Sequence, residues 1–379
     1  MAKKKKVRVD LRKNRSKPPR PQHWTRDFHD HGVEGEATTG GERVRAKGDL
    51  SRRRTIIQDE SPAASGRESD AMPAADMSKC LKGRVLRVHG LVSVVETEDG
   101  RQFRCTVRRV LRTLTTDERN IATTGDNVWF LPSANDEGVI ERVEPRHGLL
   151  TRRSKRREHV LVANVDQFVI VMSLVEPDLK PHLIDRYLAS AEQGGIAPVL
   201  CLNKADLVDA APYQPLIGLY SQLGIPTLLT SAATGIGIDR LKGRLRDRQT
   251  VFAGQSGVGK SSLLNAVQPG LALLVREVSD VNQKGKHTTT TAELRRLDCG
   301  GWVVDTPGIR QFQLWDIIPE EVEGFFPEFR PFVPLCGYPD CTHTHEDRCA
   351  IKEAVMKRLI TGHRYTSYLG LFEGTAEEI

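Results

Sequence analysis

A glycine-rich loop at residues 254–261, Gly-Gln-Ser-Gly-Val-Gly-Lys-Ser, constrains the fold more than any other feature. The apolar run 251–253 precedes it, and residues 262–266 continue it with a helical pattern. A strand, this loop and a helix in that order are typical of a phosphate-binding P-loop, whereas a flexible Gly-Ser turn needs neither neighbour. Backbone N–H groups and the helix N-terminus would surround the phosphates. The predicted phosphate-binding residues are Gly254, Gln255, Ser256, Gly257, Val258, Gly259, Lys260, Ser261 and Ser262.

Four further roles are predicted from the chemistry of phosphoryl transfer. Lys260 is expected to reach the β- and γ-phosphates as a catalytic group, and Ser261 to ligate Mg²⁺. Asp305 begins Asp-Thr-Pro-Gly after the apolar residues 302–304, which fits a carboxylate that holds Mg²⁺ through a water. Gly308 could offer its N–H to the γ-phosphate.

A second motif predicts which base is bound. Asn203-Lys204-Ala205-Asp206 follows the apolar run 198–202, and ligands of open α/β sheets bind where parallel strands end. A carboxylate at Asp206 can accept hydrogen bonds from guanine's ring N–H and amine, a donor pair that adenine lacks. Asn203 would connect this loop to the P-loop. A plain Asn/Asp turn is the alternative reading. The predicted guanine contacts are Asn203, Lys204, Ala205 and Asp206, supported by Ser231 and Ala232.

The order of these motifs is permuted. Apolar runs and helical patterns alternate along the chain, which predicts a doubly wound α/β domain with a mainly parallel sheet. In GTPases of ordinary order the P-loop comes first, but here Asn-Lys-x-Asp precedes it. The segment after Gly308 therefore runs directly into the C-terminal region. The predicted strands are 168–172, 198–202, 227–229 and 251–253, and the predicted helices are 183–193, 213–223 and 238–246.

Short β-branched runs separated by tight turns precede this domain. They predict a small β-barrel of the OB type, a fold that commonly binds nucleic acid. Glu98-Asp99-Gly100 is a hairpin-turn signal. The arginines of this segment fit either RNA binding or an ordinary solvated face. The predicted strands are 83–88, 91–96, 101–107 and 127–130, and the arginines are Arg84, Arg87, Arg101, Arg104, Arg108, Arg109 and Arg112.

A cysteine and histidine cluster lies near the C-terminus. Cys336-x4-Cys341-x-His343-x5-Cys349 offers three thiolates and one imidazole, the donor set of a closed, structural zinc site. His345 could replace His343. The other cysteines, Cys80, Cys105, Cys201 and Cys299, are expected to be packing residues, because an odd total of seven argues against disulfides and for a reducing compartment.

Around this cluster, residues 352–360 predict a helix. Arg364, Tyr365 and Tyr368 could contact RNA or pack under the zinc loop.

Residues 1–78 predict a disordered basic tail. The first 26 residues hold eleven Lys/Arg and one acid, so the remainder of the chain carries a net −3 against +7 for the whole. Such a tail fits phosphate backbones or plain solvation equally well. No apolar run reaches the ~18–20 residues of a membrane span, and no apolar stretch follows the N-terminal lysines as in a secretory signal. We therefore expect a cytoplasmic protein without a membrane contact.

Together these motifs resemble the RsgA family of ribosome small-subunit-dependent GTPases, over about residues 79–379. The resemblance also rests on Ala163-Asn164-Val165-Asp166, on Gly285-Lys286-His287-Thr288-Thr289-Thr290 and on Arg364-Tyr365-x-x-Tyr368. It implies an OB barrel at 79–149, a permuted GTPase domain at 150–314 and a zinc-binding, mostly helical domain at 315–379. It also implies a GTP- and GDP-binding monomer that joins the small ribosomal subunit and its rRNA late in assembly, with subunit-stimulated hydrolysis.

Two residues shape the expected mechanism. Many GTPases place Gln directly after Asp-x-x-Gly to orient the attacking water, but this chain has Ile309. His287 is the catalytic candidate in the threonine-rich segment, because imidazole can orient water or accept its proton. The alternative is an exposed histidine on a loop. For the whole chain, the alternatives are an RNA-binding module with a structural nucleotide domain and a small-molecule kinase.

Overall fold

The structure is a computed structural model that describes residues 4–10, 53–59, 77–108, 111, 121–154, 157–269, 271, 292–305 and 318–374. Within the predicted tail, strands β1 (Lys4–Asp10) and β2 (Arg53–Asp59) pair antiparallel. They belong to a different unit from residues 78–107 and 118–379. Disorder of residues 1–78 stays a prediction. In the described part of the chain, no helix has the length and apolarity needed to cross a membrane.

Five strands close into a barrel. Their order is β3-β4-β5-β7-β6, and β3 also pairs with β6, so no edge is left open. The pair β5 and β7 is parallel and the others are antiparallel, which is the five-stranded Greek-key arrangement of an OB barrel. The predicted barrel is therefore confirmed, although its last strand was not predicted. The strands are β3 (Leu81–His89), β4 (Val92–Thr97), β5 (Gln102–Val107), β6 (Asn127–Pro132) and β7 (Glu137–Val143).

The predicted hairpin turn joins β4 to β5. Gly100 has φ +84°, a left-handed conformation that glycine adopts without strain. Its N–H donates to the Thr97 carbonyl at 2.9 Å, and the Thr97 N–H donates to the Arg101 carbonyl at 2.9 Å. Several of the barrel arginines have intramolecular partners: Arg87 bonds Glu293, Arg101 bonds Asp99, and the Arg84 guanidinium lies over the Trp302 ring.

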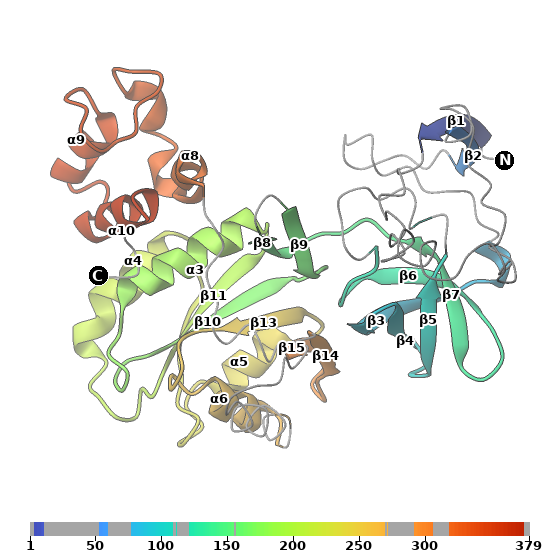
Figure 1. The fold of residues 1–379 in the computed structure, drawn as a ribbon. Helices are drawn as coiled ribbons and strands as arrows, with labels where there is room; N and C mark the ends of the chain where they lie inside the picture. Colours follow the sequence, from blue (N-terminus) through green and yellow to red (C-terminus); the bar gives the residue numbers. More distant parts are fainter. Residues whose placement is uncertain are drawn as a thin grey trace, which may run out of the picture. The chain divides into compact units, whose positions relative to one another are not determined.

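The central domain is a six-stranded sheet with helices on both faces (Figure 1). The order is β12-β11-β10-β13-β15-β14, and all neighbours are parallel except the edge strand β14. Every residue of β10 is buried, as expected for a central parallel strand. The strands are β10 (Gln167–Ser173), β11 (Ala197–Asn203), β12 (Thr227–Leu229), β13 (Gln249–Ala253), β14 (Glu293–Arg296) and β15 (Trp302–Asp305).

Two hydrophobic clusters show that the sheet is doubly wound. Residues of α3 and α4 pack with one face, and residues of α5 and α6 pack with the other. The predicted α/β class is thus confirmed, with helix ends that differ by one or two residues from the sequence pattern. The helices are α3 (Pro181–Gln193), α4 (Gln214–Gln222), α5 (Ile238–Leu245) and α6 (Lys260–Val267), with a short η4 turn (Ala211–Tyr213) before α4.

Barrel and central sheet share hydrogen bonds. Glu293 of β14 pairs with Arg87 of β3, and the Thr124 hydroxyl donates to the Ala292 carbonyl at 2.9 Å. Asn164, from the Ala-Asn-Val-Asp motif, is buried at this junction, where its side chain donates to Gly125 and accepts from His147. A hairpin of β8 (Leu150–Ser154) and β9 (Arg157–Val162) connects the two parts.

The C-terminal region is built from short helices around an aromatic core. Phe326, Phe329 and Tyr368 pack with ring centroids 5.1–5.6 Å apart. The predicted helix at 352–360 ends early, because Arg358 takes a left-handed φ of +59°. The elements are α8 (Pro319–Val322), η6 (Glu323–Phe325), η7 (Pro327–Phe329), η8 (Val333–Leu335), α9 (Ala350–Met356) and α10 (Gly362–Phe372), the last not predicted.

Candidate nucleotide site and metal centre

The parallel strands bring the predicted nucleotide motifs to one edge of the sheet. Strand β11 ends at Asn203, β13 leads into Gly254, and β15 ends at Asp305. The backbone of Asp305 is therefore at the edge where ligands of doubly wound sheets bind. The side chain of Asp305, together with His287, Gly308 and Ile309, lies outside the described residues.

The P-loop has a backbone that only glycine can supply at two positions. Gly254 has φ +143°, and a Cβ there would lie 2.1 Å from the Val171 carbonyl oxygen. Gly259 has φ +92°, and a Cβ there would lie 2.4 Å from the side-chain nitrogen of Asn203. The loop therefore packs directly on β10 and on the Asn-Lys-x-Asp motif, while Ser256 and Gly257 are exposed.

Lys260 is the first residue of α6, and its ammonium turns back over the loop. Nζ donates to the Gly254 carbonyl at 2.7 Å and to the Gln255 carbonyl at 2.5 Å. Ser261 and Ser262 follow in the first turn of α6, half-buried and exposed respectively. A lysine charge and the helix N-terminus therefore face the same loop, an arrangement that suits an anion.

Asn203 connects three loops. It is 2% exposed, and its Nδ2 donates to the Val258 carbonyl of the P-loop at 2.9 Å. Its Oδ1 accepts from the Thr230 hydroxyl at 3.2 Å, while the Ala205 N–H donates to the Thr230 carbonyl at 3.0 Å. The hydrogen bond expected between the base loop and the P-loop is present, and the Thr-Ser-Ala loop is attached to the same side chain.

The side chains on either side of Asn203 differ in exposure. Asp206 is exposed, whereas Ser231 is buried and its hydroxyl accepts from the Thr234 N–H at 3.1 Å. Lys204 has φ +61° and bonds the Glu176 carbonyl, which comes from the loop after β10. Ala232 is half-buried. The carboxylate of Asp206 is thus presented at the surface of a loop whose base is rigidly hydrogen-bonded.

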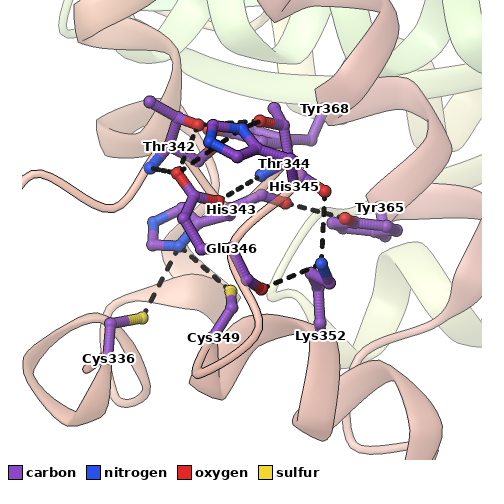
Figure 2. Close-up of polar contacts among 10 residues, drawn as sticks. All are labelled: Cys336, Thr342, His343, Thr344, His345, Glu346, Cys349, Lys352, Tyr365 and Tyr368. Carbon is purple, nitrogen blue, oxygen red and sulfur yellow. Dashed lines mark hydrogen bonds and ion pairs between the residues drawn. The ribbon is translucent and has the colours of Figure 1, made fainter. Parts of the chain in front are cut away.

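The four predicted metal ligands converge. One atom from each of Cys336, Cys341, His343 and Cys349 lies within 4.8 Å of all the others. His343 turns Nδ1 toward the sulfurs, at 3.6 Å from Cys336 Sγ and 3.4 Å from Cys349 Sγ (Figure 2). Its Nε2 lies 3.0 Å from a carboxylate oxygen of Glu323, which fixes the tautomer that leaves Nδ1 free to bind a metal. Three sulfurs and one nitrogen so close together fit a tetrahedral Zn²⁺.

Glu346 organises the loop that carries His343. Its two carboxylate oxygens accept from the Thr342 N–H, the Thr342 hydroxyl and the Thr344 N–H (Figure 2). Burial opposes ionisation, but these hydrogen bonds prevail and lower the pKa of Glu346 to about 2. Neither Glu323 nor Glu346 was predicted, because a single acidic residue far from the cluster's cysteines or between them gives no sequence signal for such a contact.

Tyr365 and Tyr368 pack under this loop. The Tyr365 hydroxyl donates to the His343 carbonyl at 2.7 Å, and the Tyr368 hydroxyl donates to the Thr342 carbonyl at 2.8 Å. Arg364 is 2% exposed, so the suggested RNA contact by this arginine is wrong. His345 is exposed and bonds Thr344, and the described cluster uses His343 instead.

The remaining cysteines behave as packing residues. All seven are free thiols. Burial raises the pKa of Cys105 and of Cys201 to about 12, which makes both thiols unreactive at neutral pH.

Comparisons with known proteins agree with this arrangement. A family model described as RsgA GTPase matches residues 143–315. "Small ribosomal subunit biogenesis GTPase RsgA" of Chlorobaculum tepidum is 41% identical over 313 residues, which span 79% of this chain and 100% of the relative. The relative of the same name in Moorella thermoacetica is 45% identical over 289 residues, 76% of this chain and 95% of that protein.

Two solved structures are similar over nearly their whole length. One, titled "Crystal structure of YjeQ from Thermotoga maritima", has a TM-score of 0.64 and 37% identity and covers 78% of this chain and 98% of its own. The other, titled "The crystal structure of YloQ, a circularly permuted GTPase", has a TM-score of 0.61 and 28% identity and covers 81% and 99%. With its OB barrel, its permuted nucleotide motifs on one sheet edge and its Cys₃His cluster, this chain belongs to the RsgA family of circularly permuted GTPases.

Proposed function

We propose that this GTPase binds the small ribosomal subunit and its rRNA, assists a late step of subunit assembly, and hydrolyses GTP faster when bound there. The observation that carries the guanine-nucleotide part is the Asn203 side chain, which joins the Asn-Lys-x-Asp loop to the P-loop. The ribosomal part is supported by relatives whose names state small ribosomal subunit biogenesis.

In this proposal each motif has one role at the nucleotide. Asp206 accepts from guanine, with the loops of Asn203 and Ser231 behind it. The P-loop N–H groups hold the α- and β-phosphates, and Lys260 stabilises the charge of the transferring phosphoryl group. Ser261 and Asp305 would hold Mg²⁺, which would supply positive charge to neutralise the phosphate oxygens. Gly308 donates to the γ-phosphate, and His287 orients the attacking water because Ile309 cannot.

The proposed metal is one structural Zn²⁺ per chain, held by Cys336, Cys341, His343 and Cys349. The short distances among the four ligand atoms and the hydrogen bond from His343 to Glu323 support this assignment. We propose domains at 79–149, 150–314 and 315–379 after a basic tail at 1–78. We also propose that the protein acts as a monomer in the cytoplasm, a reducing compartment that suits seven cysteines of which none is paired in a disulfide.

The test is GTP turnover with and without purified small subunits, for the wild type and for Lys260→Ala. We expect the subunit to accelerate the wild type strongly and the variant to be nearly inactive in both conditions, since its transition-state charge is lost. Equal turnover with and without subunits would favour an RNA-binding module with a structural nucleotide domain. Phosphate transfer to a small acceptor rather than to water would favour a kinase.

A further inference from the structure

Arg364 lies at the centre of a buried charge cluster between α10 and the central domain. We call Asp185, Tyr220, Glu328, His363 and Arg364 the Arg364 cluster. The guanidinium donates to Asp185 Oδ1 at 2.8 Å and to both oxygens of Glu328 at 2.6 and 3.2 Å. It also lies 4.3 Å above the Phe326 ring. Every donor direction of Arg364 thus points into the protein.

The side chain of Asp185 is fully buried in α3 and is held from three sides. Besides Arg364, it accepts from the Tyr220 hydroxyl at 2.9 Å, and its Oδ2 lies 3.0 Å from His363 Nε2. Burial opposes its ionisation, but His363 and Arg364 prevail and lower the pKa of Asp185. Helix α10 is therefore attached through two adjacent residues to one residue of α3, 179 positions away from Arg364 in the chain.

The loop between β10 and α3 reaches the P-loop, because a Cβ on Gly257 would lie 3.6 Å from Pro177 Cδ. In that loop the Glu176 carbonyl accepts from Lys204 of the base motif. One short stretch, residues 174–187, thus contacts both nucleotide motifs and the C-terminal region.

We propose that Asp185 and Arg364 are positioning residues for the nucleotide site. By fixing α3 against the C-terminal region, they hold residues 174–187 against Gly257 and Lys204. This gives the Cys₃His region a connection to the nucleotide that does not pass through the segment after Asp305. The effect on nucleotide affinity rests on the proposed function, whereas the effect on residues 174–187 does not.

Two variants of the full-length chain test the proposal. Asp185→Asn keeps the shape and the Tyr220 contact but removes the charge, and Arg364→Lys keeps the charge but removes the forked contact with Asp185 and Glu328. The matched control is Glu192→Gln, which removes an exposed ion pair between Arg330 and the same helix, at 2.6 Å. Exposed pairs contribute little, so this control should behave as wild type.

The measurements are amide hydrogen exchange of residues 174–187 without nucleotide, the dissociation constant of a fluorescent GDP analogue, and zinc content. We expect faster exchange in both variants, GDP binding weakened about 5- to 100-fold, the usual range of coupling between sites, and one zinc per chain. If both variants fold and residues 174–187 exchange at the wild-type rate, the proposal is overturned. It is also overturned if both variants lose zinc and the whole fold. If the variants exchange faster but the wild-type protein does not bind GDP, the positioning role stands and the proposed function is refuted.

Discussion

At the scale of single residues, one side chain of the candidate nucleotide site holds its loops together and another is exposed for contact with the base. Asn203 is buried, and its side-chain amide is hydrogen-bonded to Val258 and Thr230, so its role is to hold loops together. Asp206, three residues later, is exposed and presents its carboxylate at the loop surface. A substitution of Asn203 should therefore weaken the binding of every nucleotide, whereas a substitution of Asp206 should alter only which base is preferred.

Asp206→Asn should therefore change base preference. The amide can donate to the second carbonyl of xanthine, but it faces the guanine amine with a donor and leaves that contact unsatisfied. We expect GTP binding to weaken about 10- to 100-fold, as a lost polar pair costs about 1–3 kcal/mol, and xanthosine triphosphate binding to improve. Competition titration with fluorescent GDP measures both. Equal affinity of wild type and variant for GTP would contradict the role of Asp206.

At the scale of elements, the sequence predicted the strands and turns that have a recognisable pattern among residues close in the chain. Strands β10 to β13 contain apolar runs, and the turn at Gly100 has its own signal in Glu-Asp-Gly. Strand β7 (Glu137–Val143) carries three charged residues, and β14 is Glu-Leu-Arg-Arg, so neither has a strand pattern. Both form as hairpins with the adjacent strand in the chain, β6 and β15 respectively, and both gain a second, more distant neighbour in β5 and β3. The burial of Arg364 was unpredictable because its partner Asp185 lies 179 positions away in the chain.

The Cys₃His loop is an element that should depend on its metal. Structural zinc contributes about 10–16 kcal/mol to small domains, and here the ligands connect η8, the Thr342–Glu346 loop and the start of α9. Cys341→Ser should lose zinc and expose residues 318–374 to protease, as metal analysis and limited proteolysis would reveal. Cys299→Ser, which removes a half-buried thiol outside the cluster, is the control that should keep its zinc. A Cys341→Ser protein with wild-type zinc content would refute the assignment.

At the scale of the whole molecule, the barrel and the C-terminal region each contact the central domain, at β14 and at α3 respectively. The barrel bonds Ala292 and Glu293, which directly follow the threonine-rich segment, and the C-terminal region bonds α3. A ribosomal surface that contacts either outer part could thus bias the nucleotide site. The sequence order alone indicated only the connection after Gly308.

His287→Ala tests where subunit stimulation acts. We expect the variant to bind GTP with wild-type affinity but to lose about 10²- to 10⁴-fold in subunit-stimulated turnover, the range for a positioned acid or base. A fall in kcat without a matching change in affinity is the signature of a group that acts only in the transition state. Full stimulation of the variant would mean that the ribosome itself supplies the group.

The strand order also has a consequence for the chain as it is made. Strands β10, β11 and β12 are synthesised first, and each pairs with the one before it. The P-loop strand β13 then adds to the free side of β10, followed by β15. Domains fold as they emerge from the N-terminal end, so the guanine-reading loops can form before any phosphate-binding loop exists. A nascent chain halted before residue 249 would carry a half-built sheet with β10 as an open edge, and nucleotide binding becomes possible only once β13 and the P-loop have been added.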